Sequence, residues 1–182
     1  MACDHIESMM EDALEGTPHI DRIAFRVKGE SSFLEKAEDY EDPLKEIEDQ
    51  IGGRVIVFFV SDIAVVCDAL GKGGFHVVER ESKHPPKYSE FDYESVHYVC
   101  LIPVTAKNDS WEQHQLPTTF EIQVRTIFMH AFAEPQHDLK YKNTQQLTTK
   151  QKRKLSWIAA SAWGADEMLN NVRKELQVDG SQ

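Results

Sequence analysis

The chain has 182 residues, of which 41% are apolar and 28% are charged, and its formal net charge is −11. A chain of this size and composition can bury a core of its own, so wholesale disorder is excluded. The excess of 31 acidic over 20 basic residues argues against a protein that coats nucleic acid or an anionic membrane. The acidity is local, because residues 1–50 hold 15 of the acidic residues and only 5 of the basic ones.

The cysteines Cys3, Cys67 and Cys100 are odd in number and far apart, without a CxxC spacing. This pattern is typical of a reducing compartment and argues against a disulfide framework or a structural zinc site. The longest apolar run, residues 55–60, is too short to span a bilayer, and the acidic N-terminal segment lacks a secretion-signal pattern. We therefore expect a cytoplasmic protein without a membrane partner.

The first third of the chain predicts a helix, a strand and a second helix. A short helix is expected over residues 5–14, followed by a glycine and a proline. Residues 21–28 alternate between apolar and basic side chains, which predicts a strand with one apolar and one basic face. Ser31 and Ser32 favour the start of the next helix, which runs to Lys36.

Pro43 predicts another helix start, and Gly52-Gly53 are expected to break that helix. The apolar run of residues 54–60 predicts a central strand that is buried on both faces. Ser61-Asp62 are expected to cap the helix that follows. The remaining elements are expected as strands over 75–81, 93–102 and 118–126 and helices over 127–142 and about 149–177.

This order of elements predicts the α/β (α+β) class, with a mixed sheet of about five strands flanked by helices. The expected organisation is a single domain over residues 1–182. Its core is expected over about 20–142, and the C-terminal helix over about 149–177 is expected to be an appendage.

Two of the predicted strands carry rows of polar side chains. Glu121, Gln123 and Arg125 share one face of the strand over 118–126, and Arg26 and Lys28 share the basic face of the first strand. A carboxylate, an amide and a guanidinium in a row are costly to bury unless they face solvent or a ligand. Two such strands in one small sheet favour an anion-binding cleft, although each strand alone is compatible with an ordinary solvent-exposed face.

Further polar residues suggest phosphate and metal chemistry. Ser32 and Lys36 lie one helical turn apart shortly after Lys28, which predicts a phosphate cradle. No glycine-rich Walker loop is present, so a P-loop enzyme is excluded. Asp49 precedes the buried strand, and an acid there that meets an acid of a neighbouring strand can hold Mg²⁺. Spacing alone does not show whether Asp49 and Glu121 meet.

In chain order, these residues resemble the synthetase domain of the RelA/SpoT family, the alarmone (ppGpp) synthetases. The length resembles a stand-alone small alarmone synthetase. Each matching motif is short, but five in the family order at compatible spacings make the resemblance specific. The motifs are Arg26-x-Lys28 with Ser32 and Lys36; Asp49-x-x-Gly52-x-Arg54; Tyr93-x-Ser95-x-His97; Glu121-x-Gln123-x-Arg125-Thr126; and Met129-His130 with Ala133-Glu134, before Lys140-Tyr141-Lys142.

The resemblance implies a nucleotidyltransferase-like fold. It also implies transfer of the β,γ-pyrophosphate of ATP to the ribose 3′-hydroxyl of GDP or GTP, with release of AMP. By resemblance, Asp49 and Glu121 are catalytic and hold Mg²⁺. The ATP-binding residues so implied are Arg26, Lys28, Ser32, Lys36 and Arg54, and the acceptor-binding residues are Tyr93, His97, Gln123, Arg125 and His130.

The segment before Tyr93 departs from the family pattern, which usually has Pro-Lys-x-Asn-Gly directly before the tyrosine. Here Phe91 and Asp92 stand at the asparagine and glycine positions, and Lys87 lies two residues too far away. Glu90 or Asp92 could accept hydrogen bonds from guanine or from the amino group of adenine. Transfer to adenine nucleotides, giving (p)ppApp-type products, is therefore an open alternative.

Other readings also stay open. The basic cluster over residues 140–154 could guide transfer to the 3′ end of tRNA, as in a toxic small synthetase. A nucleotide-binding module without catalysis is disfavoured, because both metal acids are present. His137-Asp138 lacks the other ligands of a hydrolase, so we expect synthesis of alarmone and not its degradation. The apolar stripe of the last helix could pack on its own domain, form a homo-oligomer or bind an antitoxin.

Overall fold

The computed structural model describes residues 2–83, 85, 87, 90–92, 95–108, 111, 116–141 and 147–179. Its strands are β1 (Ile20–Val27), β2 (Ile51–Val57), β3 (Val77–Lys83), β4 (Ser95–Leu101) and β5 (Thr119–Thr126). Its α-helices are α1 (Ala2–Leu14), α2 (Glu30–Ala37), α3 (Pro43–Glu46), α4 (Val60–Lys72), α5 (Ile127–Tyr141) and α6 (Thr149–Asp179). Two 3₁₀ turns, η1 (Glu48–Gln50) and η2 (Val104–Ala106), complete the list.

The five strands form one sheet in the order β1-β2-β5-β4-β3. The pair β2–β5 is parallel, and the other three pairs are antiparallel. This confirms the predicted mixed sheet flanked by helices. The strand predicted to be central, β2, is interior to the sheet, and the middle position belongs to β5.

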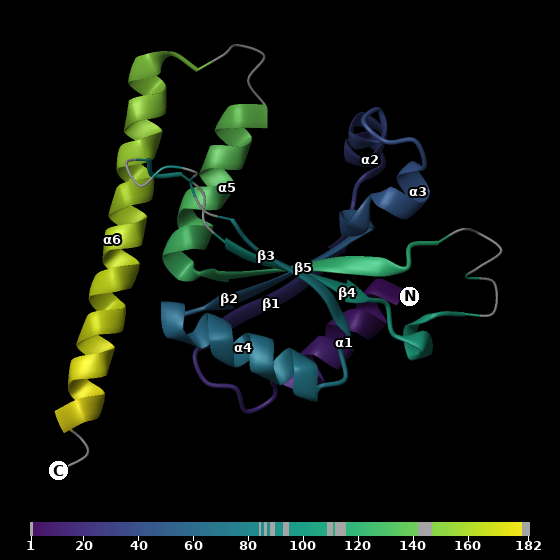
Figure 1. The fold of residues 1–182 in the computed structure, drawn as a ribbon, viewed down its shortest axis with the longest axis horizontal. Coiled ribbons are helices and arrows are strands. Elements are labelled where there is room, and N and C mark those ends of the chain that lie inside the picture. The colour runs from purple at the N-terminus through teal and green to yellow at the C-terminus, as the bar shows by residue number, and fades with distance from the viewer. Residues whose placement is uncertain are drawn as a thin grey trace.

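Helices cover the two faces of the sheet unequally (Figure 1). The helices α1 and α4 lie side by side along one face, whereas α5 stands apart from α2 and α3 on the other face. The long helix α6 runs beside α5 at the outside of the molecule. The second face of the sheet is therefore covered at its two ends by different groups of helices.

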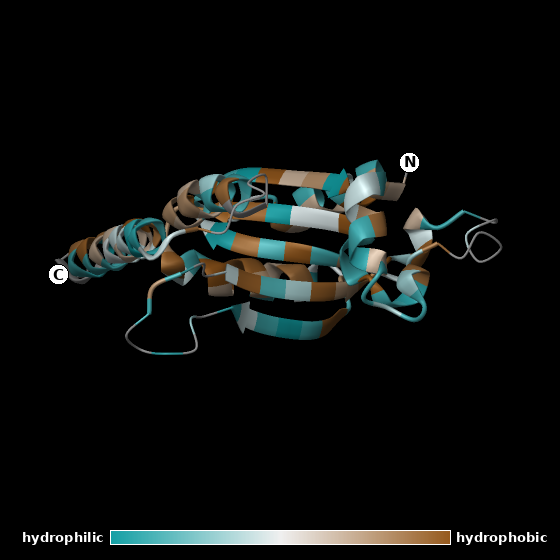
Figure 2. Cartoon of the chain, turned by 90° about the horizontal axis from the view of Figure 1, so that it is seen from above, coloured by the Kyte–Doolittle hydropathy of each residue, from teal (hydrophilic) through white to brown (hydrophobic). Residues whose placement is uncertain are grey.

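The hydrophobic core lies between the sheet and the pair α1 and α4. Helix α1 buries Ile6, Met10 and Leu14, which are four residues apart and so lie on one side of the helix. They pack with inward residues of the strands and of α4, including Val55, Val57, Val66, Leu70, Tyr98, Cys100, Phe120, Ile122 and Val124. Hydrophilic and hydrophobic residues alternate along the strands in Figure 2, so the opposite face of the sheet carries the polar side chains.

Hydrogen bonds of Asp166 and Arg173 are among the side-chain contacts that attach α6 to the rest of the domain. The hydroxyl of Thr126, at the end of β5, donates a 2.6 Å hydrogen bond to the buried carboxylate of Asp166. Farther along α6, Arg173 donates to Asp62 of α4 at 2.6 Å and to Ser61 at 3.0 Å. The long helix is thus fixed at two points about two turns apart, although much of its surface is exposed.

Gly52 and Gly53 do not break a helix as predicted, because they lie inside β2. The predicted helix from Pro43 ends at Glu46, and η1 then leads into the strand. A Cβ atom added at Gly53 would lie 2.5 Å from the ring of Phe25, so the neighbouring strand leaves no room for a side chain. Glycine therefore serves a close approach here, and this local signal is the same as that of a helix end.

Both predicted serine caps are also wrong. The residue before α2 is Gly29, and Ser31 and Ser32 lie in the first turn without capping it. Helix α4 begins at Val60, so Asp62 is inside the helix, where its buried carboxylate binds Arg173. The helix predicted over 5–14 extends back to Ala2, and the strand predicted from 75 begins at Val77.

Cys3, Cys67 and Cys100 are free thiols, as the sequence predicted. Within the described part of the chain, no helix combines the length and the apolar character needed to cross a membrane.

Candidate active site

The polar face of the sheet aligns the predicted site residues in two rows. Arg26, Gly52 and Glu121 are register partners across β1, β2 and β5. One step along, Arg54 pairs with Gln123, which in turn pairs with His97 of β4. Register partners project from the same face of a sheet, so residues that are far apart in the sequence meet here.

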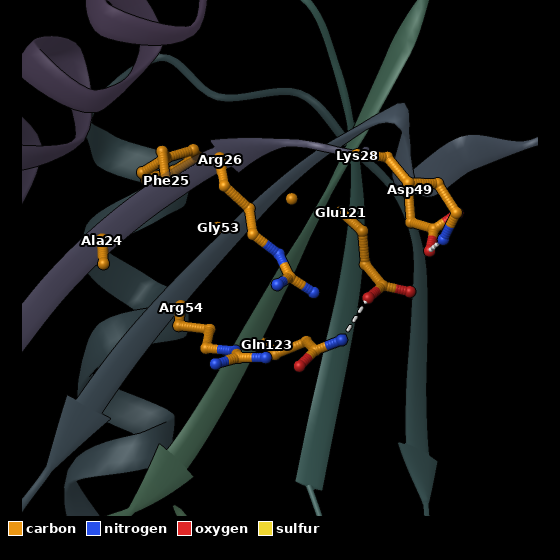
Figure 3. Close-up of a pocket in the computed structure, with 10 residues that line it drawn as sticks. Ala24, Phe25, Arg26, Lys28, Asp49, Gly53, Arg54, Glu121 and Gln123 are labelled. Carbon is orange, nitrogen blue, oxygen red and sulfur yellow. Dashed lines mark hydrogen bonds and ion pairs between the residues drawn. The ribbon is translucent and has the colours of Figure 1, made fainter. Parts of the chain in front are cut away.

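A cavity of about 130 Å³ opens at the middle of these rows. A Cβ atom added at Gly52 would have nothing within 4 Å, so this glycine leaves open space between Arg26 and Glu121. Figure 3 shows the guanidinium groups of Arg26 and Arg54 extending toward the part of the cavity that holds Glu121. The lining residues are Ala24, Phe25, Arg26, Lys28, Asp49, Gly52, Gly53, Arg54, Glu121 and Gln123.

Asp49 enters the cavity from η1, the turn directly before β2. Its Oδ2 lies 2.7 Å from Nζ of Lys28, and its Oδ1 lies 3.0 Å from Nζ of Lys36. The turn is attached to β1 because the backbone N–H of Lys28 donates to the carbonyl of Gln50 at 2.8 Å. Burial would raise the pKa of Asp49, but the hydrogen bonds from the two lysines outweigh it and the pKa is lowered.

Glu121 is the second carboxylate of the cavity, and it also has partners on both oxygens. The amide of Gln123 donates to Oε1 at 2.6 Å, and Nδ1 of His97 lies 3.1 Å from Oε2. Burial raises the pKa of Glu121, but the contact with His97 and the hydrogen bond from Gln123 leave it below its ordinary value. Both carboxylates are therefore ionised at neutral pH.

A third carboxylate, Glu134, reaches the same face of the sheet from α5. Its Oε1 lies 2.9 Å from Arg54, 3.4 Å from Arg125 and 3.9 Å from His130. The guanidinium of Arg125 also donates to the Oε1 atom of Gln123. Although burial raises the pKa of Glu134, Arg54 and its other cationic neighbours lower it further than burial raises it. One carboxylate thus fixes arginines from two different strands.

Residues 25–146 match the family described as "Region found in RelA / SpoT proteins". GTP pyrophosphokinase YjbM of Bacillus subtilis (strain 168) is 35% identical over 162 residues, which cover 87% of this chain and 74% of that protein. The chain belongs to the RelA/SpoT family.

Solved structures from this family share the fold. The small alarmone synthetase 1 from Bacillus subtilis has a TM-score of 0.78 at 27% identity, over 97% of this chain and 92% of that chain. The same synthetase bound to its product pppGpp has a TM-score of 0.77 at 26% identity, over 97% of this chain and 93% of that one. The predicted resemblance to a stand-alone small alarmone synthetase is therefore confirmed.

Most of the residues predicted from the family pattern lie together. Arg26, Lys28, Asp49, Arg54, Glu121 and Gln123 line the cavity. Lys36 and His97 reach it through Asp49 and Glu121, and Arg125 and His130 lie around Glu134. Ser32 is exposed in the first turn of α2 and is not among the lining residues. Tyr93 lies outside the described residues. The individual roles assigned to all of these residues stay predictions.

Three residues contribute to the structure of the site in ways that were not predicted from the sequence. Gly52 was expected to break a helix and was also part of a family motif, whereas in the structure it opens the cavity. Glu134 was noted only as part of a motif in the helix over 127–142. It lies four residues after His130, and this spacing indicated that the two side chains share one face of the helix. Gln136 of α5 donates a hydrogen bond to Asp92, one of the two residues that depart from the family pattern before Tyr93.

The donor set of the cavity fits a metal that is shared with a substrate. Among the residues that the structure describes, no three His, Cys, Asp or Glu side chains are grouped to hold a metal ion. Two ionised carboxylates, Asp49 and Glu121, nevertheless line one cavity. Mg²⁺ is commonly bound by one or two carboxylates together with substrate phosphates, so this pair suffices for such a site.

Proposed function

We propose that this RelA/SpoT protein transfers the β,γ-pyrophosphate of ATP to the ribose 3′-hydroxyl of GDP or GTP and releases AMP. The observation that carries the proposal is the single cavity in which Asp49 and Glu121 meet Arg26, Lys28 and Arg54. Phosphoryl-transfer chemistry needs positioned substrates and neutralised phosphate charge, and this cavity offers both. Relatives named as a GTP pyrophosphokinase and as a synthetase bound to pppGpp support the proposal.

The donor ATP is proposed to bind along β1 and β2. Guanidinium planes stack well on bases, so Arg26 and Arg54 would hold the adenine. Lys28 and Lys36, with Ser32 at the start of α2, would contact the phosphates. Lys28 and Lys36 already neutralise an anion in this structure, namely the Asp49 carboxylate, which supports their assignment to phosphate oxygens.

The acceptor nucleotide is proposed to bind on the side of β4 and β5. Tyr93 would stack on its base, and the residues His97, Gln123, Arg125 and His130 would line its site. Glu121 would orient the attacking 3′-hydroxyl and accept its proton. The hydrogen bond from Gln123 and the contact with His97 hold this carboxylate in place on the face that both substrates share.

The proposed metal is Mg²⁺, which Asp49 and Glu121 would hold together with the ATP phosphates. When bound, it would neutralise charge that develops on the transferred group. Residues 1–182 are further proposed to form one synthetase domain, and the protein is proposed to act in the cytoplasm.

The base of the acceptor nucleotide is proposed separately, because two residues before Tyr93 contact α5 and α6 in this structure. The ring of Phe91 packs against Trp163 of α6 with centroids 5.8 Å apart, and the carboxylate of Asp92 accepts a hydrogen bond from Gln136. The carboxylate of Asp92 is thus engaged by α5, so the guanine acceptor is proposed from the names of the relatives and not from a contact of Asp92 with either base. Transfer to adenine nucleotides is the alternative.

Product analysis tests both proposals together. The full chain is incubated with ATP labelled at the γ-phosphate and with GDP, GTP, ADP or AMP, and the labelled nucleotides are separated by chromatography. We expect label in a 3′-pyrophosphorylated guanine nucleotide. Equal or faster transfer without any guanine nucleotide would instead establish the adenine alternative.

A second copy of the chain is the proposed partner of α6. The side of this helix that faces away from the domain exposes Trp157 by 74%, Met168 by 65% and Leu176 by 68%. Light scattering of the full chain is expected to give a mass above that of the 20.9 kDa monomer. A monomeric mass would leave an antitoxin as the remaining proposal for this surface.

A further inference from the structure

The two carboxylates of the cavity have their oxygen atoms engaged by protein groups. Both oxygens of Asp49 are covered by ammonium groups, at 2.7 Å from Lys28 and 3.0 Å from Lys36. Both oxygens of Glu121 are covered as well, by Gln123 at 2.6 Å and His97 at 3.1 Å. A metal ion that binds Asp49 must therefore first compete with two positive charges.

The two lysines come from separate elements. Lys28 directly follows β1, whereas Lys36 lies in the last turn of α2. Through its ion pairs with the two lysines, Asp49 connects these elements to the start of β2. The side chain of Lys36 is 38% exposed, so it can turn away from Asp49 into solvent at little steric cost. A lysine ammonium on a flexible stem exchanges one anion for another more easily than a bidentate arginine does.

We infer that Lys28 and Lys36 form a latch on Asp49 that the donor's polyphosphate opens, so that metal and nucleotide bind this site cooperatively. The inference rests on the proposed function, because it takes the donor to be a polyphosphate whose charge attracts both lysines. The phosphates accept the ammonium groups and leave the Asp49 oxygens accessible to a divalent cation. Without a polyphosphate, the same lysines keep the cation affinity of the site low.

If the latch exists, replacing both lysines by neutral residues should raise the affinity for a divalent cation and lower the affinity for a polyphosphate. A Lys28→Met/Lys36→Met protein has an Asp49 carboxylate without these ammonium partners, so a divalent cation alone binds it more tightly. The same protein has lost two contacts to phosphate, so a polyphosphate binds it more weakly. A purely structural role of the lysines would not produce a gain in cation affinity.

The test measures binding of Mn²⁺, which accepts the same oxygen ligands as Mg²⁺ and is detected directly by electron paramagnetic resonance. The full chain is compared as wild type, as Lys28→Met/Lys36→Met and as Lys45→Met. The last is a matched control, because Lys45 is also paired with an aspartate, Asp42, but is not among the residues that line the cavity. Each protein is titrated with Mn²⁺ alone and with Mn²⁺ plus a non-hydrolysable ATP analogue, against a protein-free control for the analogue. Circular dichroism verifies that each variant is folded.

We expect the double variant to bind Mn²⁺ alone about tenfold more tightly than the wild type, and Lys45→Met to leave the affinity unchanged. The ATP analogue should tighten Mn²⁺ binding in the wild type and do so far less in the double variant. Adding Asp49→Asn to the double variant should abolish the gain. Equal Mn²⁺ affinity in wild type and double variant, or an equal gain in Lys45→Met, would overturn the latch.

The same titrations separate failure of the latch from failure of the proposed function. If the lysine variants gain Mn²⁺ affinity but the wild type does not bind the ATP analogue, the two lysines restrain Asp49 as inferred, and the proposed donor that would release them is wrong. If the wild type binds the analogue but the Mn²⁺ affinity is the same with and without the two lysines, ATP remains the proposed donor and the latch is refuted.

Discussion

The guanidinium of Arg54 on β2 lies 2.9 Å from the carboxylate of Glu134 on α5. The same carboxylate oxygen lies 3.4 Å from Arg125 on β5. Glu134 thereby links an arginine of the proposed ATP site to an arginine of the proposed acceptor site. Glu134 is therefore placed where it can hold these side chains in position.

Replacing Glu134 by Gln keeps the shape of the side chain but removes its charge. The two arginines are then held less firmly, so we expect the KM for ATP to rise about threefold to tenfold with a smaller change in kcat. Steady-state kinetics measure this split. Asp138→Asn, which removes an exposed carboxylate from the same helix, should leave both constants unchanged. An unaltered KM for ATP in Glu134→Gln would show that Arg54 needs no such support.

The Glu134 contacts also predict a pH dependence of stability. Burial raises the pKa of Glu134, but Arg54, His130 and Arg125 lower it below its ordinary value of 4.5. A lowered folded-state pKa stabilises the protein fully above the ordinary value, and this stabilisation is lost as the pH falls through the lower one. Because Glu134 is 46% exposed, its contribution should stay below about 1 kcal/mol. Urea unfolding should therefore separate wild type from Glu134→Gln at pH 7, and the two curves should converge as the pH falls through the lowered folded-state pKa of Glu134.

The neighbouring glycines Gly52 and Gly53 should respond in opposite ways to a larger side chain. A side chain at Gly52 meets open space, so Gly52→Val should fold normally but fill the cavity and weaken binding of an ATP analogue at least tenfold. A Cβ atom at Gly53 would lie 2.5 Å from the ring of Phe25, so Gly53→Ala should lose about 1–3 kcal/mol of stability. Thermal unfolding and analogue binding, measured on both variants, check this reversal. Loss of stability in Gly52→Val with unchanged binding would contradict it.

Arg173 should be a main anchor of α6. It donates to the buried carboxylate of Asp62 at 2.6 Å, and its guanidinium lies 4.5 Å from the ring centre of Phe59. Arg173→Met removes the arginine from a buried aspartate and should cost about 2–4 kcal/mol in the free energy of unfolding. Lys174→Met, at the exposed position next to it, is the matched control and should unfold like the wild type. Denaturant unfolding of the two variants decides the point.

Local patterns were sufficient to predict most elements of the fold. The alternation of apolar and polar residues over 21–28 and 118–126 predicted β1 and β5, because a strand repeats every two residues. The three-and-four spacing of apolar residues likewise predicted α6. Glycines were less informative as signs of element boundaries, since Gly52-Gly53 predicted a helix end and in fact lie where two strands pack closely.

The contacts that build the site could not be predicted in the same way, because they depend on register. Asp49 and Glu121 line one cavity only because β2 and β5 are paired with Gly52 opposite Glu121. Asp62 was expected to cap a helix, yet its partner is Arg173, which lies 111 residues away. The family pattern supplied the residue types of the site, whereas their partners follow from the register of the sheet and from the placement of α2 and α5 beside it.

The most direct test of pyrophosphate transfer is to count AMP and 3′-pyrophosphorylated guanine nucleotide in the same reaction. Wild type, Asp49→Asn, Glu121→Gln and the control Asp68→Asn, which alters an exposed residue of α4, are compared with ATP and GDP as substrates. The two products should form in a one-to-one ratio in wild type and Asp68→Asn, and both should fall at least about 100-fold in the other two variants. Release of AMP without the guanine product, or equal rates in Glu121→Gln and wild type, would contradict the proposed reaction.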